Sequence, residues 1–248
     1  MKILFSPSEG KKQGGVATSY AGDSFVFSEL YEKREEVLTR YKNFIVSASD
    51  EQLRKLFGIK DSSKHAPYKV PLDTLSTMKA IERYDGVAYD YLNYETLDYD
   101  AKKYVDENTI IFSNLFGPIR AGDKGLPEYK LKQGEKIDGF APEVFYKKHF
   151  SKRLDEILQE EPYLDLRAGF YNKFYKPTSA YTTLKFVKDG KVVSHWAKAY
   201  RGVVLRELAL HSIQTIEAFR KMELKNLAVK EILEKGIHTE IVFDILND

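Results

Sequence analysis

The sequence predicts an α/β protein with mixed strands and helices, folded as a single compact domain over residues 1–248. Short apolar runs typical of buried strands occur along the chain, and amphipathic helical patterns lie between them. No linker is long enough to separate two domains. The length of 248 residues and the hydrophobic content of 43% are sufficient for one large core.

The N-terminal segment predicts a buried strand at residues 3–5. This strand runs into the polar turn Ser6-Pro7-Ser8-Glu9-Gly10-Lys11-Lys12. Such a turn suits anions, because it offers free backbone N–H groups and two ammonium groups. Its spacing matches neither a Walker loop nor a dinucleotide-binding fingerprint. The pattern therefore makes Lys11 a candidate anion ligand without naming the anion, and a solvated surface turn is the competing interpretation.

Helices and strands are expected to follow in alternation. Residues 28–45 have apolar side chains at helical spacing, and Ser49-Asp50-Glu51-Gln52 is a capping-box pattern that starts a helix ending at Phe57. Residues 109–113 predict a strand. Pro142 opens a helix that runs to about Gln159, and residues 163–166 predict a short strand.

The C-terminal third predicts a hairpin and further helices. Two strand-like runs flank Asp189-Gly190, which is a strong hairpin signal. The segment after Gly202 has a helical pattern, and another helix is expected to end at Lys235, where Gly236 closes it. Residues 241–246 predict a final strand.

The charge of the chain is balanced overall but uneven locally. The net charge is +2, yet residues 167–206 contain nine basic residues and one acidic residue, about +8, with aromatic residues between them. This combination favours a phosphate-binding surface. Lysines at a hairpin tip are commonly only solvated, so Lys185, Lys188 and Lys191 are set aside. The remaining candidates are Arg167, Lys173, Lys176, Lys198, Arg201 and Arg206.

Metal and thiol chemistry have little support in the sequence. There is no cysteine, and the five histidines are scattered without a metal-binding spacing. Residues 82–107 contain eight acidic residues, but their spacing is irregular, so a solvated face is favoured over a hard-metal site. We therefore predict no metal and no cofactor.

Residues 50–66 form a candidate helix-hairpin-helix element. A helix that ends in Leu56-Phe57-Gly58-Ile59-Lys60 resembles the hairpin by which such modules present backbone N–H groups to a DNA phosphate. Gly58 and Lys60 would then be DNA contacts. Pro67 limits the length of the second helix, and an ordinary helix C-cap is the alternative.

Several separated stretches together resemble the YaaA family of bacterial peroxide-stress proteins. They keep their order and an even spacing over nearly the whole chain. They are the opening strand with Ser6-Pro7-Ser8, YDGVAYDYL (84–92), FSNLFGPIRAGD (112–123), PEYKLKQG (127–134), YLDLRAGFYNKFYKP (163–177) and WAKAYRGVVLREL (196–208). Each motif is short, and the combination is specific.

The resemblance implies a family-specific fold that binds DNA through a positively charged cleft and a helix-hairpin-helix element. It also implies a cytosolic protein that limits oxidative damage under peroxide stress and is linked to the control of free iron. Matched position by position, it favours Lys173, Lys176, Lys198, Arg201, Arg120, Lys130 and Gly58 as binding residues.

The sequence departs from the family pattern at three places. The first motif usually reads Ser-Pro-Ala-Lys-Thr, whereas here Glu9-Gly10 replace Lys-Thr. The usual Arg-Pro pair is Arg120-Ala121, and the Asn-Leu-Ala-Ser block reads Asp165-Leu166-Arg167-Ala168. A carboxylate at position 9 weakens the case for a phosphate contact there, and Lys11 is the nearest substitute.

We therefore expect a DNA-binding protein of the peroxide-stress response, without strong sequence specificity and with no protein partner. No apolar run approaches the 18 residues of a membrane span and no signal peptide is visible, so a cytoplasmic location is expected. One alternative is an enzyme that acts on a phosphorylated or nucleic-acid substrate in the same cleft, with Glu9 or Asp165 as general base. Another is iron or haem sequestration by residues 82–107.

Overall fold

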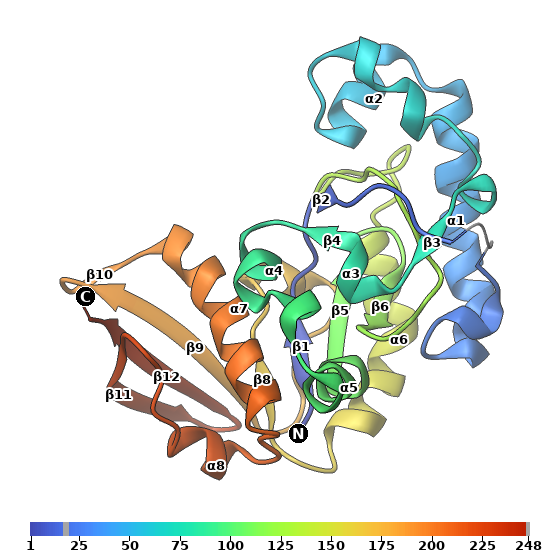
Figure 1. Cartoon of the computed structure of the whole chain (residues 1–248). Coiled ribbons are helices and arrows are strands. Elements are labelled where there is room, and N and C mark those ends of the chain that lie inside the picture. The colour runs from blue at the N-terminus through green and yellow to red at the C-terminus, as the bar shows by residue number, and fades with distance from the viewer. Residues whose placement is uncertain (17–19, 247–248) are drawn as a thin grey trace.

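A mostly parallel β-sheet forms the centre of the computed structural model, which describes residues 1–16 and 20–246, without the side chains of residues 194 and 195 (Figure 1). In spatial order the strands are β11 (Leu227–Lys235), β12 (His238–Ile245), β9 (Tyr181–Lys188), β8 (Tyr163–Asp165), β1 (Ile3–Phe5), β5 (Thr109–Ser113) and β6 (Gly117–Arg120), and β10 (Lys191–Val192) pairs with β9. Only the edge strands β6 and β11 and the short β10 run antiparallel to their neighbours. The α/β class is confirmed.

The central strands are continuous apolar runs because both faces of the sheet are covered. Every residue of β1, β5 and β8 is buried, and Ile3 lies level with Thr109 on one side and Leu164 on the other. Strands covered on both faces lose the apolar–polar alternation of half-exposed strands. The predicted strands at 109–113 and 163–166 are confirmed, and the second ends one residue early.

Helices cover both faces of this sheet. α4 (Val87–Leu92), α5 (Tyr99–Asn108) and α7 (Ser194–Leu210) lie on the near face in Figure 1, and α6 (Pro142–Leu158) lies behind. α1 (Tyr31–Ser47) contacts α6 through Arg34, whose guanidinium lies 5.4 Å from the ring of Phe150. In the described part of the chain, no helix combines the length and the apolarity needed to cross a membrane.

Short elements complete the fold. Two small antiparallel ribbons are formed by β2 (Gly10–Lys11) with β4 (Tyr84–Asp85) and by β3 (Thr77–Met78) with β7 (Leu126–Pro127). The other helices are α2 (Asp50–Phe57), α3 (Ala80–Arg83), α8 (Ile216–Arg220) and the 3-10 turns η1 (Gly22–Ser24), η2 (Ser28–Leu30), η3 (Ser62–Lys64), η4 (Ala66–Tyr68), η5 (Leu72–Thr74), η6 (Tyr94–Thr96) and η7 (Gly169–Lys173).

Local sequence signals set several helix ends. The Ser49 hydroxyl accepts a hydrogen bond from the Gln52 N–H at 3.3 Å, and the Gln52 side chain accepts one from the Ser49 N–H at 2.8 Å. This reciprocal pair is the predicted capping box. Gly58 ends α2 with φ +69°, a left-handed conformation that favours glycine. The helix predicted from Pro142 is also confirmed, because α6 spans Pro142–Leu158.

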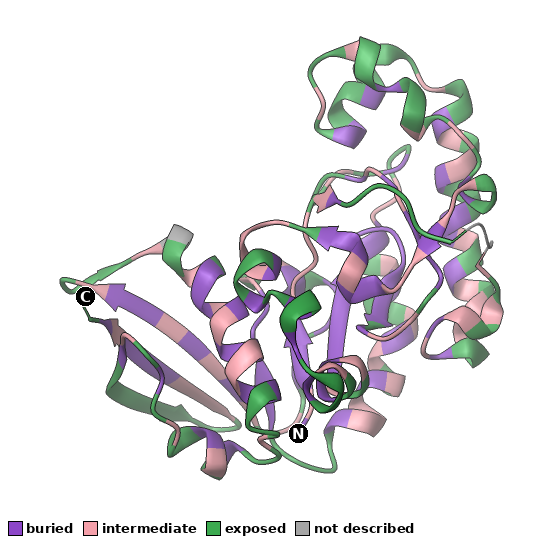
Figure 2. Ribbon diagram, viewed as in Figure 1, coloured by how far each residue is buried: buried purple, intermediate pink, exposed green. Residues whose placement is uncertain are grey.

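The C-terminal third differs from the prediction at three elements. The hairpin turn at Asp189-Gly190 is confirmed, but its second strand has only two residues, and α7 begins at Ser194 and not after Gly202. The predicted helix ending at Lys235 is wrong, because Leu227–Lys235 is the edge strand β11. All its residues after Leu227 are exposed (Figure 2), so the strand shows no alternation, and pairing with β12 defines it.

Residues 49–75 form a helical lobe that projects from the sheet (Figure 1). Its small core includes Leu53, Leu56, Phe57 and His65. After Gly58 the described residues 59–75 contain only the 3-10 turns η3, η4 and η5 and no α-helix. The first helix and the glycine turn of the helix-hairpin-helix candidate are therefore present, whereas a second α-helix is not formed there.

Candidate functional site

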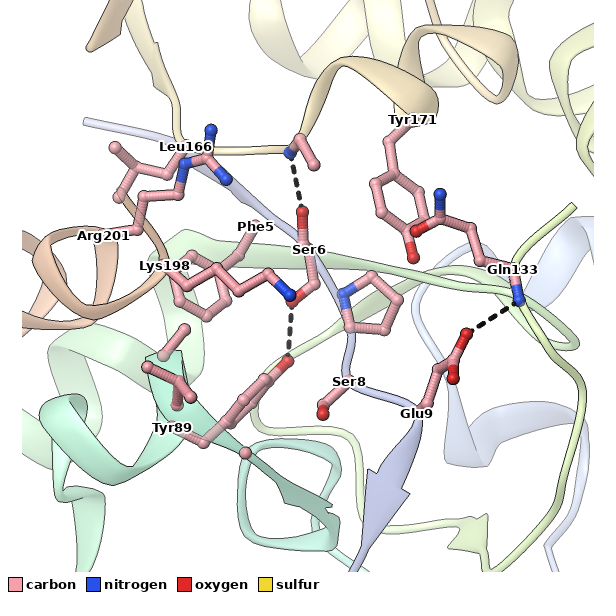
Figure 3. A pocket seen from close by; sticks show the side chains of 15 residues that line it. Phe5, Ser6, Ser8, Glu9, Tyr89, Gln133, Leu166, Tyr171, Lys198 and Arg201 are labelled. Carbon is pink, nitrogen blue, oxygen red and sulfur yellow. Dashed lines mark hydrogen bonds between the residues drawn. The ribbon is translucent and has the colours of Figure 1, made fainter. Parts of the chain in front are cut away.

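A cavity of about 360 Å³ lies at the carboxyl ends of β1 and β8 (Figure 3). From β1 the chain continues toward β5 on one side of the sheet, and from β8 it continues toward β9 on the other. The two connections diverge and leave a crevice between them. In open α/β sheets, ligands bind in such a crevice.

The floor of the cavity is the Ser6-Pro7-Ser8 turn that follows β1. The Ser6 hydroxyl accepts a hydrogen bond from the Ala168 N–H at 2.8 Å, and the Ser6 carbonyl accepts one from the Tyr89 hydroxyl at 2.9 Å. These two bonds attach the turn to the segment after β8 and to α4. The position of the turn is therefore set from both sides.

Two cations from α7 point into the cavity. Lys198 and Arg201 are three residues apart, so they share one face of the helix. Neither forms a hydrogen bond or an ion pair with any side chain that the structure describes. Burial lowers the pKa of the Arg201 guanidinium, and the nearby Asp165 partly offsets this effect. An unpaired charge taken out of water is costly, so an anion in the cavity would relieve the cost at Arg201.

A glycine contact brings α7 close to the cavity. A Cβ on Gly202 would lie 2.0 Å from the carbonyl oxygen of Ala88, so only glycine permits this approach of α7 to α4. Gly86 has φ +144°, and a Cβ there would lie 2.6 Å from the Ser8 hydroxyl oxygen. Gly86 thus lets the start of α4 approach the turn after β1, and Gly202 lets α7 approach α4. Together these contacts place Lys198 and Arg201 near the turn.

The opposite side of the cavity carries a carboxylate. Figure 3 shows Glu9, Gln133 and Tyr171 across the Ser6-Pro7-Ser8 turn from Lys198 and Arg201. The Glu9 carboxylate accepts a hydrogen bond from the Gln133 N–H at 3.3 Å. The cavity thus has one cationic end and one end that accepts hydrogen bonds.

The predicted anion ligand Lys11 lies outside the cavity. Its side chain is buried, and its ammonium donates to the carbonyls of Ser8 and Glu9 at 3.3 and 3.5 Å. The same nitrogen lies 4.0 Å from the centre of the Tyr129 ring. Burial and, to a lesser extent, the positive charge of Lys130 lower the pKa of Lys11 to about 7. In this arrangement Lys11 stabilises the turn.

Arg167 and Asp165 neutralise one another. The guanidinium donates to the carboxylate through Nε at 2.8 Å and through Nη2 at 2.7 Å, and both side chains are buried. Arg167 also donates to the carbonyls of Tyr171 and Tyr175. This pair orders the segment after β8. The geometry leaves Arg167 no free donor face for DNA and does not favour Asp165 as a general base.

Arg206 and Arg120 also lie away from the cavity. Arg206 donates to the carbonyls of Leu92 and Asn93, at 2.9 and 3.1 Å, and so satisfies the C-terminus of α4. Arg120 is exposed at the end of β6, level with Ile110 near the amino end of β5. It therefore lies near the amino ends of the parallel strands, whereas the cavity lies at their carboxyl ends.

The other predicted contacts do not line the cavity. Lys130 donates to the Glu9 carbonyl at 3.2 Å, and its ammonium lies 5.4 Å from the Tyr68 ring. Gly58 is tied to the same segment, because the Lys132 N–H donates to the Leu56 carbonyl at 2.8 Å. Lys60, Lys173 and Lys176 are exposed. Their contact with DNA stays a prediction.

Sequence reasoning missed part of the cavity lining. Tyr89 and Tyr171 lie within family-like blocks, but nothing in their spacing distinguished them from core tyrosines. Gln133 reaches the cavity only because the segment after β7 folds beside Glu9. Such a contact between distant segments leaves no local signal.

No metal-binding cluster is found in the described residues: nowhere do three histidine or acidic side chains gather as ligands. Within the acidic segment 82–107, Glu95 pairs with Lys12 at 2.5 Å and Asp106 pairs with Lys79 at 2.8 Å. These two carboxylates of the acidic segment are therefore engaged in ion pairs.

The fold and site define an α/β protein with a cavity at a topological switch point, into which two cations point. The family model described as "Peroxide stress protein YaaA" matches residues 1–233, so the chain belongs to this family, as the sequence motifs suggested. An uncharacterized protein of Campylobacter jejuni is 50% identical over 247 residues, which cover 100% of both chains. A UPF0246 protein of Corynebacterium efficiens is 34% identical over 84% of this chain and 85% of its own. One from Streptomyces coelicolor is 30% identical over 84% and 82%.

Proposed function

We propose that this peroxide-stress family member is a cytoplasmic protein that binds DNA without strong sequence preference and thereby limits iron-driven damage. The observation that carries the proposal is the pair Lys198 and Arg201, which face the cavity without a partner among the described side chains. Phosphate oxygens are the anions that DNA offers at every step, whatever its sequence.

Further basic residues near the cavity support the same proposal. Lys173 and Lys176 follow β8 and are exposed, and Lys130 flanks Glu9. In the helical lobe, Lys60 follows Gly58 and is exposed. A backbone that contacts these groups together would release counterions, so binding should weaken steeply with salt.

Fluorescence anisotropy with labelled duplex, single-stranded and junction DNA tests this proposal directly. Titrations over a salt series should give a straight line of log affinity against log salt with a negative slope, and the slope estimates how many phosphates are engaged. Absence of binding at low salt for all three DNAs would overturn the proposal.

A second candidate is an enzyme that acts on a phosphorylated or nucleic-acid substrate in the same cavity. The observation that favours it is the Glu9 carboxylate across the turn from Lys198 and Arg201, which would place a base opposite a phosphate clamp. Incubation with nucleotides and nucleic acids plus divalent metals tests for turnover. Loss of any turnover in Glu9→Gln, with binding retained, would assign the base.

A further inference from the structure

We infer that the cavity holds a single nucleotide that ends in a phosphate monoester, with the phosphate on Lys198 and Arg201 and the nucleoside toward Tyr171 and Glu9. This inference rests on the proposed function, because it gives the same two cations a defined ligand. The ligand is either a free nucleoside monophosphate or the 5′-phosphorylated end of a strand.

The size of the cavity suits a single nucleotide. Its volume of about 360 Å³ lies at the lower end of the roughly 300–1,000 Å³ that small-molecule sites span. Such a space accommodates one nucleotide and excludes a continuous duplex. Duplex DNA would therefore meet only the mouth of the cavity and the exposed lysines around it.

The charge of the cationic end suits a phosphate monoester. Lys198 and Arg201 together supply two positive charges, and neither forms an ion pair with a described side chain. A phosphate monoester carries about −1.5 to −2 at pH 7, whereas a phosphodiester carries only one negative charge. A terminal phosphate therefore matches the two cations better than an internal one.

The end of the cavity at Glu9 and Tyr171 suits a nucleoside. The Glu9 Oε1 accepts from Gln133, and Oε2 accepts no hydrogen bond from the described residues, so it remains able to accept one from a sugar hydroxyl or a base N–H. The Tyr171 hydroxyl is used by Asn114 at 3.1 Å, which leaves the ring as an aromatic wall. Phe5 and Leu166 supply apolar lining between the two ends.

Glu9 favours a free nucleotide over one that is joined to a strand. In a strand, a second phosphate follows the sugar, and this is also true of the nucleotide at a 5′-phosphorylated end. With the first phosphate on Lys198 and Arg201, that second phosphate would approach the exposed Glu9 carboxylate across the cavity. Like charges repel each other, so the carboxylate disfavours a strand end relative to a free nucleoside monophosphate.

Isothermal titration calorimetry with the full chain tests the inference. The probes are dAMP, dGMP, dCMP and dTMP, with deoxyadenosine and inorganic phosphate as fragments. We expect at least one monophosphate to bind about tenfold more tightly than either fragment, because phosphate and nucleoside ends contribute together. A strand with a 5′-phosphate should compete about tenfold better than the same strand with a 5′-hydroxyl if strand ends are the source.

Matched variants locate the binding. Arg201→Gln and Lys198→Gln should each weaken monophosphate binding about tenfold, whereas Lys188→Gln at the β9–β10 tip should leave it unchanged. Lys198 is exposed, so its variant keeps the test valid if Arg201→Gln fails to fold. Thermal melting of each variant checks folding.

The outcomes separate this inference from DNA binding. If inorganic phosphate binds as tightly as every monophosphate, or if no monophosphate binds, the inference is overturned, whereas DNA binding in the anisotropy titration would still stand. If a monophosphate binds and no DNA does, the inference holds with a free nucleotide as ligand and the DNA proposal fails.

Discussion

Arg201 illustrates at the residue scale how the surroundings of a side chain can suggest a binding role. Its guanidinium faces the cavity, its pKa is lowered by burial, and it has no partner among the described side chains. By contrast, the buried Arg167 has five protein oxygens within hydrogen-bonding distance of its guanidinium, two of them on Asp165. Two arginines from one basic segment thus differ: Arg167 orders a loop, and Arg201 is one of the two cations that we propose to bind an anion.

The first prediction concerns the cost of this unpaired charge. Replacing Arg201 by Met should raise the free energy of unfolding of the ligand-free protein by up to about 1 kcal/mol, because an uncompensated charge is removed from a partly buried position. The same variant should bind DNA more weakly. Urea unfolding and anisotropy measure the two effects, and a variant that is both less stable and unimpaired in binding would contradict this role.

The second prediction concerns Lys11, whose pKa of about 7 lies below the 10.5 of the unfolded chain. Between these values the unfolded state binds one more proton than the folded state, so stability rises with pH in that window. The wild type should therefore gain about 2 kcal/mol in the free energy of unfolding from pH 7 to pH 9 relative to Lys11→Met.

Denaturant unfolding at pH 7 and pH 9 measures this difference. Identical pH dependence of the wild type and Lys11→Met would show that the Lys11 amine is not desolvated. The assignment of Lys11 to the interior would then be wrong.

At the scale of elements, the contact between α4 and α7 controls the cavity. Gly202 allows the two helices to approach, and Lys198 and Arg201 reach the turn after β1 only from a closely packed α7. The third prediction is that Gly202→Ala moves α7 outward, because its Cβ would lie 2.0 Å from the Ala88 carbonyl oxygen. We expect a loss of about 1–3 kcal/mol in stability and weaker anion binding.

A glycine elsewhere supplies the control. Gly169 has no atom within 4 Å of an added Cβ and does not adopt positive φ, so Gly169→Ala should leave stability and binding nearly unchanged. Thermal melting and anisotropy of both variants measure the contrast. Equal behaviour of the two variants would show that the helix contact does not position the cations.

The elements that could be predicted from sequence are those with a local signal. The capping box at Ser49, the apolar run at 109–113 and the Asp189-Gly190 turn each depend on neighbouring residues, and each is present. β11 has no such signal, because its exposed Lys and Glu residues suit a helix as well as an edge strand. Hydrogen bonding to β12 defines it as a strand. β12 is in turn held in the sheet by pairing with β9, which is distant from it in the sequence.

At the scale of the whole molecule, folding divides the basic segment 167–206 into parts with different roles. Arg167 and Arg206 are used inside the protein, and Lys185 lies 3.8 Å from Glu240. Lys198 and Arg201 reach the cavity. A charge count along the sequence therefore located the segment that supplies both cations of the cavity, but it could not separate structural cations from free ones, since that division depends on distant partners.

The lining of the cavity shows the same limit. The switch point depends on strand order, which places β1 between β5 and β8 although these strands are far apart in the chain. Glu9 was noticed in the sequence as a departure from the family pattern. Its hydrogen bond to Gln133 and its position opposite the cations became visible only in the folded molecule.

The fourth prediction tests the central claim that Lys198 and Arg201 are the phosphate contacts. The double variant Lys198→Gln/Arg201→Gln is compared with Lys188→Gln/Lys191→Gln, which removes the same charge at the β9–β10 tip. The measurement is the salt dependence of duplex DNA affinity by fluorescence anisotropy. We expect the cavity variant to bind more weakly, with a slope shallower by about 2 units, and the tip variant to match the wild type. Equal slopes for the two variants would contradict the assignment of DNA binding to this cavity.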